Sequence, residues 1–140
     1  MNNEEQSALN AVMNFLDSYA KRNVEACMSA IAVSRPILLL GTNDNEVFRT
    51  TEDVRDAFKR DFASMTNIRW GKQRNVHVVS TPTTSSVMVE LPISYQTDGK
   101  DVEVLFRYAL TLTKEGEQWK ICSGMASVPF AAGTYSFSEP

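Results

Sequence analysis

The chain has 140 residues, of which 43% are hydrophobic and 22% are charged, and its formal net charge is −3. This length and composition are typical of one globular domain that buries enough apolar surface to fold without a metal or a disulfide. We therefore expect a single domain over residues 1–140. Acidic and basic residues are interspersed, so the sequence has no clustered basic face and argues against a nucleic-acid partner.

The sequence predicts neither a membrane segment nor a secretory signal. Its longest strongly apolar run, residues 37–40, is too short to cross a bilayer, and the acidic N-terminus lacks the basic and continuously apolar regions of a signal peptide. The two cysteines, Cys27 and Cys122, are far apart and show no metal-binding or redox spacing, which favours two reduced, packed thiols. We expect a cytoplasmic protein that does not associate with membranes.

The N-terminal part of the chain predicts two consecutive helices. Apolar residues recur at helical spacing from about residue 4 to residue 21, and polar residues occupy the opposite stripe. Asn23 is a good N-cap, so a short second helix is expected over residues 24–31.

A short strand and a third helix are predicted next. Pro36 prevents further helix, and residues 37–40 predict a short buried strand that is followed by a loop rich in turn-forming residues. Thr50 and Asp53 have the spacing of a capping box, which predicts a third helix that runs to about Met65.

From there on, apolar and polar residues alternate, as in strands. Four long segments rich in Val, Thr, Tyr and Ile predict strands, over residues 67–80, 85–98, 101–114 and 118–128. The residues predicted to share one face of the last strand are Trp119, Ile121, Ser123, Met125 and Ser127. Turn pairs at 98–99 and 115–116 predict hairpins, hence an antiparallel meander with one face against the helices. Strands of this length must twist, so we expect the sheet to curl around the helices and leave a cavity open at one end.

Three stretches of the sequence resemble SnoaL-like (polyketide-cyclase-like) domains of the nuclear-transport-factor-2-like superfamily. They are FLDSYAKRNVEACMSAI, GTNDNEVFRTTEDVRDAFKRDF and YALTLTKEGEQWKICSGMASVPF, and together they span nearly the whole chain. The resemblance implies an α+β fold in which three N-terminal helices pack on a strongly curved, mixed or antiparallel sheet. This cone-shaped arrangement is a cystatin-like roll.

The resemblance implies little specific chemistry. Many members carry a histidine on the last strand, where this chain has Met125. Ketosteroid-isomerase-like members use a tyrosine, an aspartate and a later acid, and these positions fall near Phe15, Leu39 and Tyr108. Two of the three groups are therefore missing, and the third is matched only as a phenol, so isomerase chemistry by that route is not expected.

The residues themselves offer few candidates for acid–base or metal chemistry. Proton transfer needs a titratable group inside the cavity, and the alternation places Glu90, Glu103 and Arg107 on the outer face of the sheet. His77 is the only histidine and is interpreted as a surface or structural residue rather than a catalytic base. No metal-ligand spacing or phosphate-binding loop is present, so we expect no metal and no cofactor.

The predicted cavity lining is apolar and aromatic with a few hydroxyls. The residues predicted to bind a ligand are Tyr19, Trp70, Tyr108, Met125 and Ser127. Such a lining suits a flat apolar small molecule that is held by shape and by one or two hydrogen bonds.

Two hypotheses about function follow. The first is a protein that binds an apolar small molecule, or a lyase or isomerase of unknown substrate that relies on pocket shape and hydroxyl groups. The second is a non-catalytic association module, a homodimer formed through the outer sheet face, where Met88, Pro92 and Leu105 lie among polar residues. The tail over residues 130–140 is expected on the surface or against a partner subunit.

Overall fold

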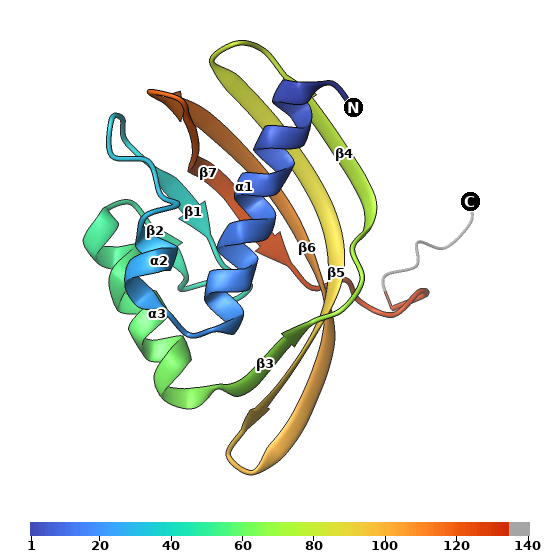
Figure 1. Cartoon of the computed structure of the whole chain (residues 1–140). Coiled ribbons are helices and arrows are strands. Elements are labelled where there is room, and N and C mark those ends of the chain that lie inside the picture. Colours follow the sequence, from blue (N-terminus) through green and yellow to red (C-terminus); the bar gives the residue numbers. More distant parts are fainter. Residues whose placement is uncertain (135–140) are drawn as a thin grey trace, which may run out of the picture.

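The computed structural model describes residues 1–134, and its three helices come before most of the sheet (Figure 1). The helices are α1 (Asn3–Ala20), α2 (Val24–Met28) and α3 (Thr51–Ser64). Asn2 and Glu5 form a capping box at the start of α1, and Thr50 and Asp53 form the predicted one at the start of α3. All three predicted helices are confirmed, although α2 ends at Met28 and not at residue 31.

The sheet has seven strands and is mixed. The strands are β1 (Leu38–Leu40), β2 (Val47–Phe48), β3 (Thr66–Trp70), β4 (Arg74–Ser80), β5 (Thr84–Thr97), β6 (Lys100–Glu115) and β7 (Gln118–Ser127). Their order is β2-β1-β7-β6-β5-β3, with β4 also paired to β5, and only the β1–β7 pair is parallel. The predicted meander of long strands is therefore confirmed in β5, β6 and β7.

The prediction of one strand over residues 67–80 is wrong, because the segment forms two strands. Gly71 interrupts it: its amide donates to the Pro92 carbonyl at 2.8 Å, and a β-carbon at this glycine would lie 2.9 Å from the Pro92 ring. Both β3 and β4 pair with β5, one at each end of that long strand. Asn75 has a positive φ of 50°, and the register shifts around it, so β4 contains a bulge.

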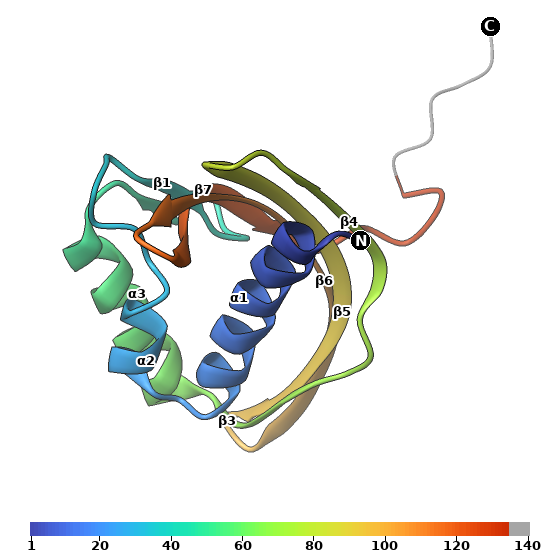
Figure 2. The same ribbon diagram turned by 45° about the horizontal axis from the view of Figure 1, so that its top comes forward.

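The sheet curves around α1, while α2 and α3 lie across the open side of the curve (Figure 2). The inner face of β5 forms the floor of the core, with Val87, Val89, Leu91 and Ile93 each 0% exposed. From α1, the residues packed into this core are Ala8, Leu9, Val12 and Leu16. The predicted α+β class, with helices on a strongly curved sheet, is confirmed.

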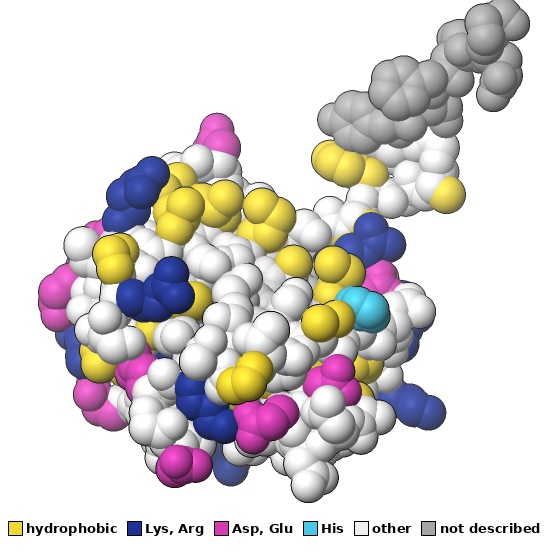
Figure 3. All heavy atoms as spheres, turned by 90° about the horizontal axis from the view of Figure 1, so that it is seen from above, with side chains coloured by type: hydrophobic (Ala, Val, Ile, Leu, Met, Phe, Trp, Pro, Cys, Tyr) yellow, Lys and Arg dark blue, Asp and Glu magenta, His cyan; other side chains and the backbone are white. Residues whose placement is uncertain are grey.

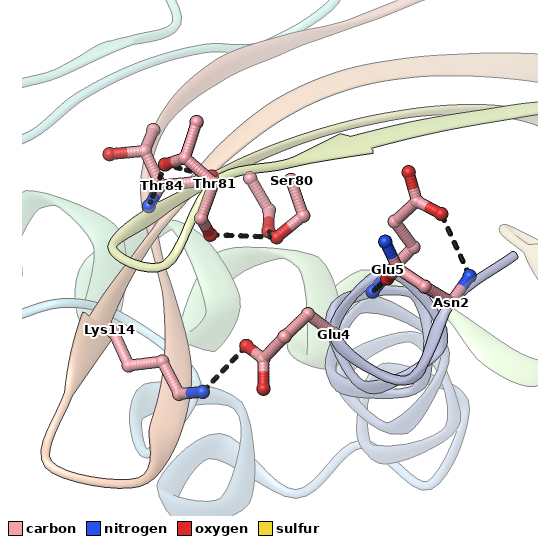
Figure 4. Close-up of polar contacts among 8 residues, drawn as sticks. Asn2, Glu4, Glu5, Ser80, Thr81, Thr84 and Lys114 are labelled. Carbon is pink, nitrogen blue, oxygen red and sulfur yellow. Dashed lines mark hydrogen bonds and ion pairs between the residues drawn. The ribbon is translucent and has the colours of Figure 1, made fainter.

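Polar contacts attach the N-terminal end of α1 to the sheet (Figure 4). Lys114 of β6 reaches across to Glu4 at 2.7 Å, and its ammonium lies over the indole ring of Trp119, with Nζ 4.9 Å from the ring centroid. Nearby, the hydroxyls of Ser80 and Ser85 are 2.7 Å apart. The ion pair fixes the N-terminal end of α1 on β6, and the C-terminal end of α1 borders a cavity.

Two sequence expectations concern the chain's surroundings. Among residues 1–134, no helix combines the length and the apolar character that crossing a membrane requires. Of the predicted surface tail, Phe130 is 67% exposed, and residues 135–140 lie outside the described residues.

Candidate functional site

A cavity of about 280 Å³ lies between α1, α3, the segment over residues 39–48 and the inner face of β6 and β7. Its walls are mostly apolar and include several aromatic rings, and the aromatic residues that line it are Phe15, Tyr19, Phe48, Phe58, Tyr95, Phe106 and Tyr108. Most of these rings contact one another edge-on or tilted, at centroid distances near those favoured by aromatic pairs. The fold thus forms a small cavity with several aromatic rings beside the C-terminal end of α1.

A tyrosine and an aspartate meet in this cavity. The Tyr19 hydroxyl on α1 donates a hydrogen bond to Asp61 Oδ2 on α3 at 2.7 Å, and it lies 3.6 Å from the sulfur of Met65. Burial raises the pKa of the Asp61 carboxyl, and the Tyr19 hydrogen bond opposes part of this rise. Burial, together with the charge of Asp61, also raises the pKa of the Tyr19 phenol. The pair therefore combines a neutral phenol with a carboxyl that holds its proton to a higher pH than usual.

Tyr108 supplies a second phenol to the same cavity. It lies on the inner face of β6, and its ring packs against those of Trp70 and Phe106 at centroid distances of 6.0 and 5.8 Å. Burial raises the pKa of this phenol, and the charge of Asp61 adds to the rise. Its hydroxyl makes no hydrogen bond with any residue of the described part of the chain, so it is available to a bound molecule.

Tyr19 and Tyr108 are thus the two predicted ligand-binding residues whose side chains the structure brings together. Trp70 lies behind this wall and does not line the cavity. Its indole nitrogen donates to the Leu16 carbonyl of α1 at 2.8 Å, so the residue holds the helix against the sheet. Ligand binding by the two tyrosines remains a prediction.

The predicted inner face of β7 holds only for its first half. Leu112 pairs with Ile121 but Thr111 pairs with Ser123, so Cys122 is an extra residue in a β-bulge. The bulge reverses the alternation, and Gly124 and Ala126 replace the predicted residues on the inner face. Met125 pairs with Ala109 on the outer face, although part of it borders the cavity, and Ser127 lies away from the cavity.

The role of Trp70 predicts a separation between stability and binding. We expect Trp70→Phe to lower the free energy of unfolding by roughly 1–2 kcal/mol, because the hydrogen bond from the indole to the Leu16 carbonyl and part of the buried ring are lost. Affinity for a cavity ligand should change little. Chemical denaturation of the variant measures the loss of stability, and a binding titration measures its affinity. A loss of affinity without a loss of stability would contradict a structural role for Trp70.

Asp61 is the functional candidate that the sequence interpretation missed. That interpretation found no acid on the predicted inner faces, whereas Asp61 lies three residues after Phe58 and four before Met65. This spacing places it on the same helical stripe as the core residues of α3. An acid on an apolar stripe was the available signal.

Other features of the described residues fit a site less well. A more open hollow of about 480 Å³ lies on β3, β5 and β6, where Asn67, Gln96 and Asp101 satisfy one another by hydrogen bonds. His77 is exposed and pairs with Met88 on the outer face of the sheet. Within residues 1–134, no three His, Cys, Asp or Glu side chains are grouped so that they could hold a metal ion.

A family model described as a SnoaL-like domain matches residues 8–131. The chain belongs to the SnoaL-like domain family. A search of curated proteins found no match. The membership agrees with the order of helices and strands and with a cavity inside the curve of the sheet. It does not by itself give this SnoaL-like protein a ligand or a reaction.

Solved structures share the fold at low identity. A protein from Streptomyces avermitilis, provisionally named a dehydratase of the NTF2-like family, is similar with a TM-score of 0.83 and 18% identity, over 91% of this chain and 97% of its own. A provisionally named scytalone dehydratase from Novosphingobium aromaticivorans has a TM-score of 0.80 and 9% identity, over 96% of this chain and 90% of its own. A provisionally named calcium/calmodulin-dependent protein kinase II association domain from Xanthomonas campestris has a TM-score of 0.73 and 18% identity, over 86% of this chain and 85% of its own. The superfamily fold predicted from the sequence is confirmed.

Proposed function

We propose that the aromatic cavity is a binding pocket for a compact, largely apolar small molecule. The observation that carries the proposal is the Tyr108 hydroxyl, which faces an aromatic chamber without a partner among the described residues. A few polar groups on an otherwise apolar wall normally fix the orientation of a bound molecule, so an unpartnered hydroxyl on this wall supports a ligand that accepts or donates a hydrogen bond there. The volume of about 280 Å³ favours a ligand at the small end of the usual range.

If the pocket is also catalytic, as a lyase or an isomerase, Asp61 is the group that would accept a proton. Its raised pKa brings it closer to the range that suits a general base, and the Tyr108 hydroxyl could donate to an oxygen of the substrate. The names given to the two dehydratase neighbours agree with this class of reaction. Binding is the part of the proposal that can be tested without knowing the substrate.

The test is thermal melting of the protein against a broad panel of compact aromatic and aliphatic compounds. A ligand at 100 times its Kd should stabilise the protein by about 2.7 kcal/mol and raise the Tm by several degrees. Ala126→Phe fills the pocket from β7 and should abolish the shift, while Ser127→Phe, one residue along and away from the cavity, should retain it. No shift with any compound, or equal loss in both variants, would refute the proposal.

A second candidate function is association through the outer face of the sheet. Met88, Ala109 and Met125 form one row across β5, β6 and β7, and the two methionines are 52% and 47% exposed. Figure 3 shows hydrophobic side chains beside the single histidine, whose strand partner is Met88. In the next row, Glu90 is paired with Arg107 at 2.5 Å, so the charges there are largely neutralised. An exposed apolar row of this kind supports a homodimer.

We expect Met88→Glu to convert this dimer into a monomer, because it would place a carboxylate in the apolar row that the dimer buries. The control is Val33→Glu, since Val33 is 79% exposed but lies in the loop after α2. Sedimentation equilibrium over a range of protein concentrations measures the change. A monomeric wild-type protein, or a dimer that survives Met88→Glu, would count against association through this face.

A further inference from the structure

The charged groups that line the cavity all have the same sign. They are Glu46, in the turn that leads into β2, and Asp61 on α3, and no lysine, arginine or histidine lines the cavity. Glu46 is held in place, since one of its oxygens accepts from the Asn43 amide at 2.8 Å and its side chain packs against Gly41. The negative charge at this end of the cavity is therefore fixed by the backbone of the turn.

Asp61 has no cationic partner within residues 1–134. Its one hydrogen bond is to Tyr19 through Oδ2, which leaves Oδ1 without a partner among the described residues. Arg60 lowers the pKa of Asp61 as a nearby charge but forms no ion pair with it in the described part of the chain, and the Arg22 guanidinium donates to the Phe62 carbonyl. A carboxylate that has lost part of its hydration is stabilised by a nearby positive charge, so a cationic ligand in the cavity would pair favourably with Asp61.

The aromatic walls reinforce the preference for positive charge. Tyr19 meets the carboxylate through its hydroxyl, and Phe58 and Tyr108 line the same cavity. The faces of aromatic rings attract cations through their quadrupoles, most strongly where water is excluded. Neither of the two phenols carries a charge at neutral pH, because burial raises both pKa values further. A carboxylate in a cavity with several aromatic rings favours an amine with an apolar body over a neutral molecule or an acid.

We infer that the pocket takes an organic cation: a compact apolar body with a protonated amine that pairs with Asp61. This inference rests on the proposed binding function and adds the class of ligand. A neutral molecule could satisfy the Tyr108 hydroxyl, but it would displace water from the Asp61 carboxylate without supplying a counter-charge. An acid would bring a second negative charge next to Asp61 and Glu46.

The charge of the ligand can be varied while its size is kept. Tryptamine, tryptophol and indole-3-acetate share one aromatic body and carry a cation, a neutral hydroxyl and an anion, respectively. At pH 7.5, calorimetric titration should give tryptamine about tenfold higher affinity than tryptophol. A hydrogen bond to a charged group contributes more free energy than a neutral one, and the difference corresponds to about a factor of ten in affinity. Indole-3-acetate should bind most weakly of the three.

Two variants assign the preference to Asp61. Asp61→Asn keeps the size of the side chain and an acceptor for Tyr19, and it should remove the advantage of tryptamine over tryptophol. Asp56→Asn removes an equal charge from the exposed side of α3 and should leave the advantage intact. Equal or tighter binding of tryptophol by the wild-type protein, or an unchanged preference in Asp61→Asn, would overturn the inference.

The dependence on pH gives an independent readout. Asp61 is faced by Tyr19 from α1, Glu46 from the turn and Tyr108 from β6, with Arg60 on its own helix. Tryptamine stays protonated over pH 5–8, so its affinity should rise as Asp61 loses its proton, while that of tryptophol should not.

If the indole series fails but other compounds in the broad panel bind, this inference falls and the proposed function stands; if nothing binds, both fall.

Discussion

Gly124→Ala is expected to destabilise the protein by about 3 kcal/mol or more, enough to threaten folding of a domain of ordinary stability. Gly124 has a φ of +144°, and an added β-carbon would lie 2.2 Å from the Ala109 carbonyl oxygen and 2.8 Å from the Leu110 α-carbon. Both neighbours belong to the backbone of β6, so neither can move without breaking the ladder between β6 and β7. Denaturation by urea measures the loss.

Gly99→Ala is the matched control, because it separates backbone strain from steric overlap. Gly99 also has a positive φ, of +72°, but nothing lies within 4 Å of the position that its β-carbon would take. We expect a loss of about 1 kcal/mol there, from the left-handed conformation alone. If both alanine variants lose the same amount, close packing at Gly124 does not contribute, and the geometry of β7 described above is wrong at this point.

The alternating pattern predicts most of the sheet because burial on one face forces period-two sequences. Val87, Val89, Leu91 and Ile93 follow that rule without interruption, and each is fully buried. In β7 the rule fails at Cys122, because a single inserted residue reverses the alternation and the residues after it could face the core in either register. Glycine at 124 is the one hint, because isolated glycines inside strands often accompany bulges or close backbone approach.

The candidate site was predictable to the extent that its residues lie on regular elements. Tyr19 and Tyr108 follow from helical and strand periodicity, and both line the cavity. Trp70 follows the same periodicity, but its indole nitrogen is taken by the Leu16 carbonyl, a partner on a helix 54 residues away that no local pattern reveals. Asp61 was missed because the prediction assigned only apolar residues to the core stripe of α3.

Asp61→Asn should stabilise the protein at neutral pH while weakening its proposed function. The native state raises the pKa of this carboxyl above its ordinary value of 3.8, chiefly by burial. Between that value and the native pKa, the folded protein binds more protons than the unfolded chain, so stability falls as the pH rises. Above the native pKa, the full cost of burying the charged carboxylate lowers the stability of the folded protein. Asparagine removes this cost and still accepts the Tyr19 hydrogen bond.

The gain should lie near the lower end of the roughly 0.5–2 kcal/mol typical of stabilising substitutions, because solvent screens a partly exposed carboxylate. Denaturation of wild type and variant from pH 4 to pH 8 should show curves that meet at the acid end and separate towards pH 8. Tyr19→Phe should steepen the wild-type decline, since the hydrogen bond from Tyr19 favours the charged form of Asp61. A less stable Asp61→Asn at pH 8 would mean that the carboxylate is satisfied in the empty pocket, which would remove the reason for a cationic ligand. A more stable one would mean that the protein retains a charge that only binding can compensate.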